Sequence, residues 1–180
     1  FLNLISIIAA KNPEWSARKL VFFLSVFPIY LVASSLINSR EKMVRAIKFF
    51  LSGGAIVAFL GIAQFALQFI IGLETTYKLW AKVTVPFLGA SLSKMVSIYP
   101  SWLVNVSGHT TLRATSLFPD PHMFSFYLGL LLPLALGMFF REKRMIYLAS
   151  FVLLAAADIA TFSRGGYAGI ITGILAFFAF

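Results

Sequence analysis

Apolar residues in this chain form long runs that are separated by short polar or charged stretches. A helix that crosses a membrane needs about 20 mostly apolar residues, within a usual range of about 17–25. The apolar runs predict complete or partial spans at 1–10 (partial), 20–37, 49–73, 122–140, 145–162 and 167–180 (partial). The longest polar interval, 74–121, is expected to form a loop on the outer face of the membrane. The pattern therefore predicts an all-α protein, a polytopic transmembrane helix bundle with five to six spans.

Composition and charge support a membrane protein. Of the 180 residues, 60% are hydrophobic and only 12% are charged, and the mean hydropathy is +0.91. A soluble domain of this length needs a far more polar surface. The formal net charge is +9, but the basic residues lie at the ends of the apolar runs, which indicates anionic membrane lipid rather than nucleic acid as their partner. The absence of cysteine excludes disulfides and thiolate metal sites.

The two ends of the chain and its basic loops give further expectations. The chain begins with Phe1 rather than Met and ends inside the apolar run "GILAFFAF". We therefore expect both ends to be truncated, so that the chain is an internal fragment of a longer membrane protein. The short loops 38–48 and 141–144 hold seven basic residues and are expected to be cytoplasmic. This orientation places Arg113 and Arg164 together on the outer face.

Two sets of residues in and before the outer loop have structural interpretations. Aromatic residues and lysines are interspersed in the loop, as is typical of a segment that lies at the membrane interface. They are Trp80, Tyr99 and Trp102 with Lys78, Lys82 and Lys94. Gln64 and Gln68 are four residues apart, so they share one face of the predicted helix. That face forms interhelical hydrogen bonds or lines a polar cavity.

The stretch "TFSRGGYAG", residues 161–169, places an arginine between two apolar runs. A charge at the bilayer centre costs about 2.5–3.5 kcal/mol on insertion scales, and less near the interface. Ser163 can cap the helix that follows, and Gly165 and Gly166 would leave its first backbone N–H groups open to a ligand. A helix N-terminus beside the Arg164 guanidinium is suited to binding an anion. The alternative is an arginine whose side chain extends to the lipid headgroups.

A second polar stretch, "RATSLFPDPHMFSFYL", covers residues 113–128. Asp120 can cap a helix whose first position suits Pro121, so a span is expected to begin here. The two prolines of this stretch stiffen the entry and would hold Arg113 in place relative to the bundle. His122 falls in the first turn, where it is either a neutral interfacial histidine or a catalytic base.

Asp158 lies in the last turns of the predicted span 145–162. An ionisable residue inside a span points to a functional site, and either Arg113 or Arg164 is expected to pair with it. The alternative is a structural ion pair without chemistry. The two histidines are far apart in the sequence and no carboxylates are paired, so we expect neither a metal site nor a cofactor. No nucleotide-binding motif occurs either.

Three segments together resemble a known family. They are "RATSLFPDPHMFSFYLGLLLPLAL", "TFSRGGYAGIITGIL" and, before the outer loop, "GAIVAFLGIAQFAL" at 54–67. In this order they resemble the O-antigen ligase and O-antigen polymerase superfamily of bacterial envelope enzymes. The resemblance covers most of residues 20–180, and one departure is His122, where family members often carry Asn.

The resemblance implies a multi-span, metal-independent glycosyltransferase at the outer, periplasmic face of the bacterial cytoplasmic (inner) membrane. Such enzymes move a glycan from undecaprenyl pyrophosphate to a hydroxyl of lipid A core, of a polysaccharide or of a protein. The family's functional arginines correspond to Arg113 and Arg164, with Ser163, Gly165, Gly166, Asp120, His122 and Asp158 as candidates for substrate binding. The family's general base, a histidine, would lie beyond Phe180.

The chemistry of the residues agrees with this implication, but two other functions are open. Negative charge builds on the departing phosphate when a sugar leaves a pyrophosphate lipid, and fixed guanidinium groups can stabilise it. The same arginines could line the pathway of an anion transporter or channel component. They could also anchor a non-catalytic scaffold of envelope assembly to lipid headgroups.

Overall fold

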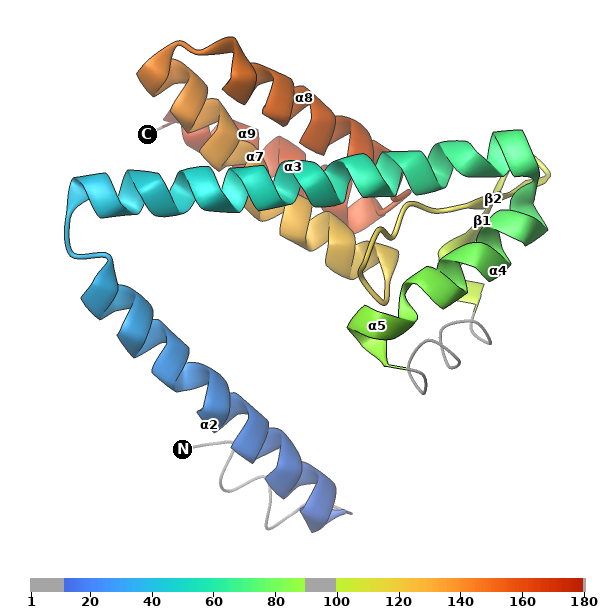
Figure 1. Cartoon of the computed structure of the whole chain (residues 1–180), viewed down its shortest axis with the longest axis horizontal. Coiled ribbons are helices and arrows are strands. Elements are labelled where there is room, and N and C mark those ends of the chain that lie inside the picture. The colour runs from blue at the N-terminus through green and yellow to red at the C-terminus, as the bar shows by residue number, and fades with distance from the viewer. Residues whose placement is uncertain (1–11, 90–99, 180) are drawn as a thin grey trace. The chain divides into compact units, whose positions relative to one another are not determined.

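The computed structural model describes residues 12–89 and 100–179 (Figure 1). The chain divides into two compact units, Phe1–Ile47 and Lys48–Phe180. In the first unit, α2 (Pro13–Leu36) has no buried residue, and most of its apolar side chains are exposed. It begins with a proline, which suits the first turn because the N–H that proline lacks has no partner there in any helix.

The helix α3 (Arg40–Ile71) begins much earlier than the predicted span 49–73. The expectation of a basic loop over 38–48 is therefore wrong from Arg40 onward. Arg, Glu, Lys and Met are good helix formers, so a charged segment that follows a cap continues into the apolar run without a break. Ser39 provides that cap, since its hydroxyl accepts a hydrogen bond from the backbone N–H of Lys42 at 3.3 Å.

The second unit contains three further long helices, α7 (Pro121–Glu142), α8 (Met145–Ile159) and α9 (Arg164–Ala179). The helix α7 packs against both α8 and α9. Only Lys143 and Arg144 connect α7 to α8, and Lys143 adopts the left-handed conformation (φ 55°) that reverses the chain. Because this connection is so short, α7 and α8 run antiparallel.

Two of the three glycines of α3 allow close helix packing. A β-carbon on Gly54 would overlap the side chain of Leu131, and one on Gly61 would lie 2.7 Å from the ring of Phe124. Both partners belong to α7, so these glycines let α3 approach that helix. Gly53 has open space where its β-carbon would be and makes no such contact.

The interval between α3 and α7 contains regular structure that the sequence pattern did not predict. A hairpin pairs β1 with β2 antiparallel, from Leu103 opposite Leu112 to Val106 opposite His109. Its turn residues Ser107 and Gly108 both have positive φ, as a tight two-residue hairpin turn requires. The described part of this interval contains α4 (Leu73–Val83), α5 (Val85–Leu88), the 3₁₀ turn η1 (Pro100–Trp102), β1 (Leu103–Val106) and β2 (His109–Leu112).

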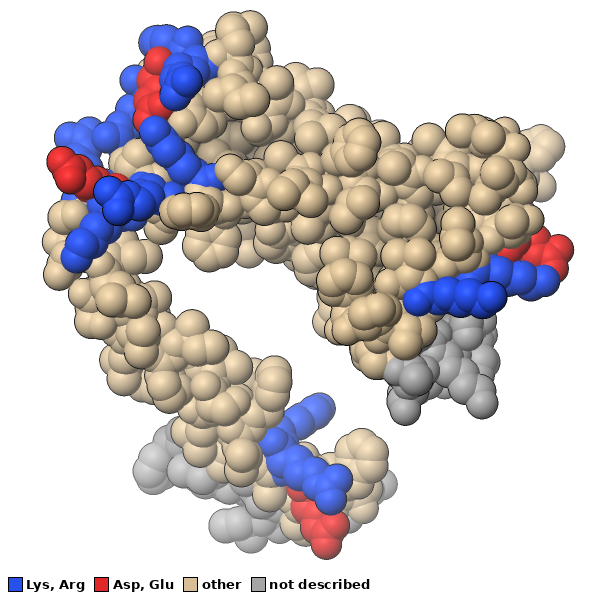
Figure 2. Space-filling model, viewed as in Figure 1, with Lys and Arg blue, Asp and Glu red and all other residues tan. Residues whose placement is uncertain are grey.

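The all-α class is confirmed, with one short hairpin added. In the part of the chain that the structure describes, three helices are long and apolar enough to cross a membrane: α2, α3 and α7. The apolar helices α8 and α9 have 15 and 16 residues and are shorter. The predicted partial span at 1–10 lies outside the described residues. Figure 2 shows Lys and Arg gathered at helix ends and mostly uncharged atoms along the helices.

Candidate functional site

Arg113 lies directly after β2 and is buried, with only 7% of its surface exposed. Its Nε donates to the carbonyl oxygen of Thr161 at 2.7 Å, and its Nη2 donates to that of Phe162 at 3.2 Å. Its Nη1 donates to the carbonyl oxygen of Ser101 at 3.1 Å. The first two bonds tie the loop before α7 to the turn between α8 and α9, and the third ties it to the 3₁₀ turn η1. Arg113 and Arg164 are thereby brought to the same end of the helices, as the predicted orientation required.

The Arg113 guanidinium keeps its positive charge in this buried position. Burial lowers the pKa of Arg113, while the nearby carboxylate of Asp120 acts in the opposite direction. An arginine is not deprotonated under ordinary conditions, because the pKa of a guanidinium lies far above neutral pH. Carbonyl oxygens take three of its five N–H donors, so two donors remain for a further acceptor.

Two glutamines of α3 hold the segment around Arg113 by its backbone. Gln64 accepts the N–H groups of Thr115 and Ser116 on its Oε1, both at 2.9 Å. Gln68 pairs with both backbone groups of Leu112, accepting its N–H at 2.7 Å and donating to its carbonyl oxygen at 3.0 Å. Both glutamines are buried. Their shared face is confirmed, but their bonds go to the end of β2 and to the loop that follows it rather than to another helix or to a cavity.

Two tryptophans fasten the next part of the same segment. The Nε1 of Trp80 donates to the carbonyl oxygen of Ser116 at 2.7 Å, and that of Trp102 donates to the carbonyl oxygen of Pro119 at 2.9 Å. Both rings are buried, Trp102 completely. These tryptophans therefore hold the loop in place, because each indole N–H finds a partner in a loop carbonyl. That the segment lies at the membrane interface stays a prediction. Tyr99 and Lys94 lie outside the described residues.

The starts of α7 and α9 are joined by a side-chain contact. Asp120 caps α7, since its Oδ1 accepts the N–H of His122 at 2.7 Å. Ser163 caps α9 in the same way, with its Oγ accepting the N–H of Gly166 at 3.2 Å. Both predicted caps are confirmed. The Oγ of Ser163 also lies 2.9 Å from the Nδ1 of His122, and the histidine tautomer decides which atom donates.

The cap changes what α9 can offer to a ligand. Because Ser163 takes the N–H of Gly166, that amide is not open, and Gly166 itself is buried. Within the described residues, the backbone N–H groups of Arg164 and Gly165 have no hydrogen-bond partner, and both residues are exposed. The expectation of an open amide thus holds for Gly165 but not for Gly166. The Arg164 side chain makes no ion pair with any described residue.

Asp158 is completely buried near the end of α8. Its backbone carbonyl accepts from the hydroxyl of Thr161 at 2.6 Å, but its Oδ2 has no hydrogen-bond partner of good geometry among the described residues. The expected ion pair with Arg113 or Arg164 is not formed, although all three residues are described. Arg113 binds carbonyl oxygens and Arg164 is exposed. The carboxyl group of Asp158 therefore lies without an arginine where α7, α8 and α9 pack together.

Gly166 completes the contact between these three helices. A β-carbon at this position would overlap the hydroxyl of Ser125 on α7 and would lie 3.1 Å from Oδ1 of Asp158 on α8. The Oγ of Ser125 is itself buried and lacks a partner of good geometry in the described part of the chain. Glycine at 166 is therefore required by packing around Asp158, a role that the sequence pattern did not distinguish from anion binding.

The gathered groups are suited to an anion at this end of the bundle. Negative charge is favoured by the exposed Arg164 guanidinium, by the first amides of α9 and by two N–H donors of Arg113 that have no partner among the described residues. Within 12–89 and 100–179, no three His, Cys, Asp or Glu side chains lie close enough to hold a metal ion. Comparisons with known protein families, with curated proteins and with solved structures found no match.

Proposed function

We propose that this protein is a membrane glycosyltransferase of the O-antigen ligase type. In this proposal it moves a glycan from undecaprenyl pyrophosphate to an acceptor hydroxyl on lipid A core, a polysaccharide or a protein. It acts at the periplasmic face of the bacterial cytoplasmic membrane and contributes five to six spans to a polytopic bundle. The observation that carries the proposal is the convergence of Arg113, His122, Ser163 and Arg164 at the starts of α7 and α9.

The two arginines have different roles in this mechanism. Arg164 is exposed, so its planar guanidinium can contact the oxygens of the carrier pyrophosphate. Arg113 is held by three carbonyl oxygens, so it supplies a fixed positive charge and positions the turn that precedes Arg164. Fixed charges stabilise the developing charge of the leaving phosphate because they need no reorganisation during the reaction.

The imidazole ring of His122 contacts the start of α9. Its Nδ1 is engaged with Ser163, and its backbone N–H is engaged with Asp120. We assign it to orienting the start of α9 and, through its second ring nitrogen, to hydrogen bonding with the substrate. Asp158 has a supporting role in helix packing, since it lies buried beneath Gly166.

The test is a comparison of Arg164→Lys with Arg141→Lys, which makes the same change in the last turn of α7, at the other end of that helix. The protein is reconstituted into liposomes with a lipid-linked oligosaccharide donor and candidate acceptors. The measurements are binding of undecaprenyl pyrophosphate, release of the carrier and acceptor mass. We expect Arg164→Lys to lower donor binding and transfer by about 10²-fold or more, the usual loss for one electrostatic donor in a transition state. Arg141→Lys should behave as the wild type.

Three results would contradict the proposal in different ways. Full activity of Arg164→Lys would remove the phosphate contact from the mechanism. Equal loss of activity in both variants would indicate that replacing any arginine disturbs the fold, rather than that Arg164 contacts the donor. If the wild type binds no carrier pyrophosphate and transfers no glycan but moves an anion across the liposome membrane, the protein is a transporter.

A further inference from the structure

A pocket opens between α3 and the beginning of α8. It lies near the C-terminal end of α7, whereas the Arg113 turn lies near the N-terminal end of that helix. Since α7 has 22 residues, its two ends are about 30 Å apart at a rise of about 1.5 Å per residue. The pocket has a volume of about 570 Å³, which is within the range of about 300–1,000 Å³ typical of small-ligand sites. Its lining residues come from α3 and from the beginning of α8: Lys48, Leu51, Ser52, Arg144, Ile146, Tyr147 and Ser150.

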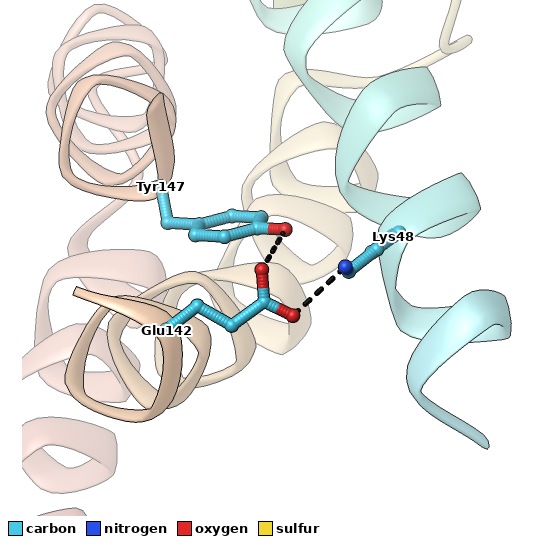
Figure 3. Close-up of polar contacts among 3 residues, drawn as sticks. All are labelled: Lys48, Glu142 and Tyr147. Atoms are coloured by element: carbon cyan, nitrogen blue, oxygen red, sulfur yellow. Dashed lines mark hydrogen bonds and ion pairs between the residues drawn. The ribbon is translucent and has the colours of Figure 1, made fainter. Parts of the chain in front are cut away.

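Two of the lining residues, Lys48 and Tyr147, belong to a polar cluster that is centred on Glu142 (Figure 3). The Nζ of Lys48 lies 2.8 Å from Oε1 of Glu142, and the hydroxyl of Tyr147 donates to Oε2 of Glu142 at 3.0 Å. Both oxygens of Glu142 are therefore engaged. Lys48 has three N–H donors and Glu142 takes one of them, so the ammonium group can also bind an anion.

The charges around the pocket do not cancel. Lys48 and Arg144 contribute two positive charges, and Glu142 contributes one negative charge, which leaves +1. The Arg144 side chain is exposed. The helix α8 begins immediately afterwards without a side-chain cap, so its N-terminal dipole adds positive potential at the same place. An occupant of this pocket is therefore expected to carry negative charge.

The surroundings of the pocket are apolar, which restricts what the anion can be. Its lining is mostly carbon, from Leu51, Ile146 and the ring of Tyr147. A second groove of about 550 Å³ runs along the next face of α8, from Met145 to Ala156, and is lined only by apolar residues. Both openings include a residue of the first turn of α8, Ile146 in the pocket and Met145 in the groove. A small soluble anion makes no favourable contact with such an apolar surface, whereas an acyl chain can pack against it.

We infer that this pocket binds the phosphate headgroup of an anionic phospholipid, with an acyl chain lying along the groove from Met145 to Ala156. Lys48 and Arg144 bind the phosphate oxygens, and Glu142 limits the affinity by competing for Lys48. The basic α7–α8 connection is expected to lie on the cytoplasmic side, where anionic lipid is attracted by such residues. The site concerns membrane lipid and is independent of the glycosyl transfer proposed above.

The experiment counts retained lipids by native mass spectrometry. The chain is purified in detergent with equal amounts of phosphatidylglycerol and phosphatidylcholine, and the phospholipids that remain bound to it are identified. The wild type should retain phosphatidylglycerol preferentially. Arg144→Gln should lower that retention about fivefold, the effect of one cation near a lipid surface. The matched control is Arg141→Gln, which removes the same charge from a residue that does not line the pocket, and it should retain lipid like the wild type.

Two further variants separate a specific pocket from a general surface charge. Glu142→Gln removes the competitor for Lys48, so retention of phosphatidylglycerol should rise. Ser150→Leu reduces the space of the pocket without changing charge, so retention should fall while thermal stability stays near that of the wild type. Equal retention of both lipids by the wild type would overturn the inference, as would equal loss in Arg141→Gln and Arg144→Gln. A fall in retention for Glu142→Gln would also overturn it, because the carboxylate would then be needed rather than inhibitory.

Discussion

The loop that carries Arg113 depends on one buried amide side chain, Gln64. Its Oε1 accepts the N–H groups of Thr115 and Ser116, both at 2.9 Å. Its Nε2 donates to the hydroxyl of Thr115 at 3.1 Å. We predict that Gln64→Leu, which keeps most of the side-chain volume, releases this loop from α3. The change leaves two buried backbone donors without an acceptor.

The magnitude follows from the number of groups left unpaired. A buried donor without a partner costs about 1–3 kcal/mol, so two of them cost about 2–6 kcal/mol. Because the loop can shift to admit water, we expect the lower part of this range, about 2–4 kcal/mol. That difference corresponds to about a 30- to 700-fold larger equilibrium constant for local opening, at about 1.4 kcal/mol per factor of ten.

Amide hydrogen exchange in detergent measures this opening directly. The amides of Thr115 and Ser116 should exchange faster in Gln64→Leu by the factor given above, while amides in the middle of α8 should change little. The control is Gln64→Glu, which retains an oxygen for both N–H groups and can accept from the Thr115 hydroxyl, now 3.3 Å from Oε1. It should keep most of the protection. Unchanged exchange in Gln64→Leu would refute the conclusion that Gln64 holds the loop.

Two other predictions concern packing and charge. In a thermal unfolding measurement, Gly166→Ala should lower the free energy of unfolding by about 1–3 kcal/mol, because the new methyl group overlaps Ser125. The control is Gly169→Ala, whose new methyl group meets nothing within 4 Å, and it should be neutral or slightly stabilising. The Lys78 ammonium lies 2.6 Å from Glu74 and lowers the pKa of that carboxyl. Since the pKa is lowered in the folded state, the pair supports α4 at neutral pH and loses this effect as the pH falls through the lowered pKa. Lys78→Met should raise the pKa of Glu74 in an NMR titration; an unchanged value would show that the pair does not form in solution.

The class of the protein and several of its local features are properties of the sequence alone. Apolar runs of helical length require helices, because the backbone must satisfy its own hydrogen bonds in an apolar environment. The caps at Asp120 and Ser163 are also local, since each side chain reaches an N–H two or three residues further on. Close packing at Gly54 and Gly61 was likewise predictable from small residues on a helix.

The roles of the polar residues in the apolar bundle depend on partners far along the chain. The partners of Gln64, Thr115 and Ser116, are separated from it by 51 and 52 positions in the sequence. The carbonyl oxygens that Arg113 binds belong to residues 48 and 49 positions after it. Neither partner has a sequence signal, because every residue has a carbonyl oxygen and almost every residue has an N–H. The sequence pattern therefore predicts that Gln64 lies on a helix face and Arg113 in a loop. It does not predict which groups these two side chains bind. Only the tertiary structure decided that Arg113 joins the α8–α9 turn and that Asp158 remains without an arginine, since both outcomes depend on which backbone groups are left unpaired when the helices pack.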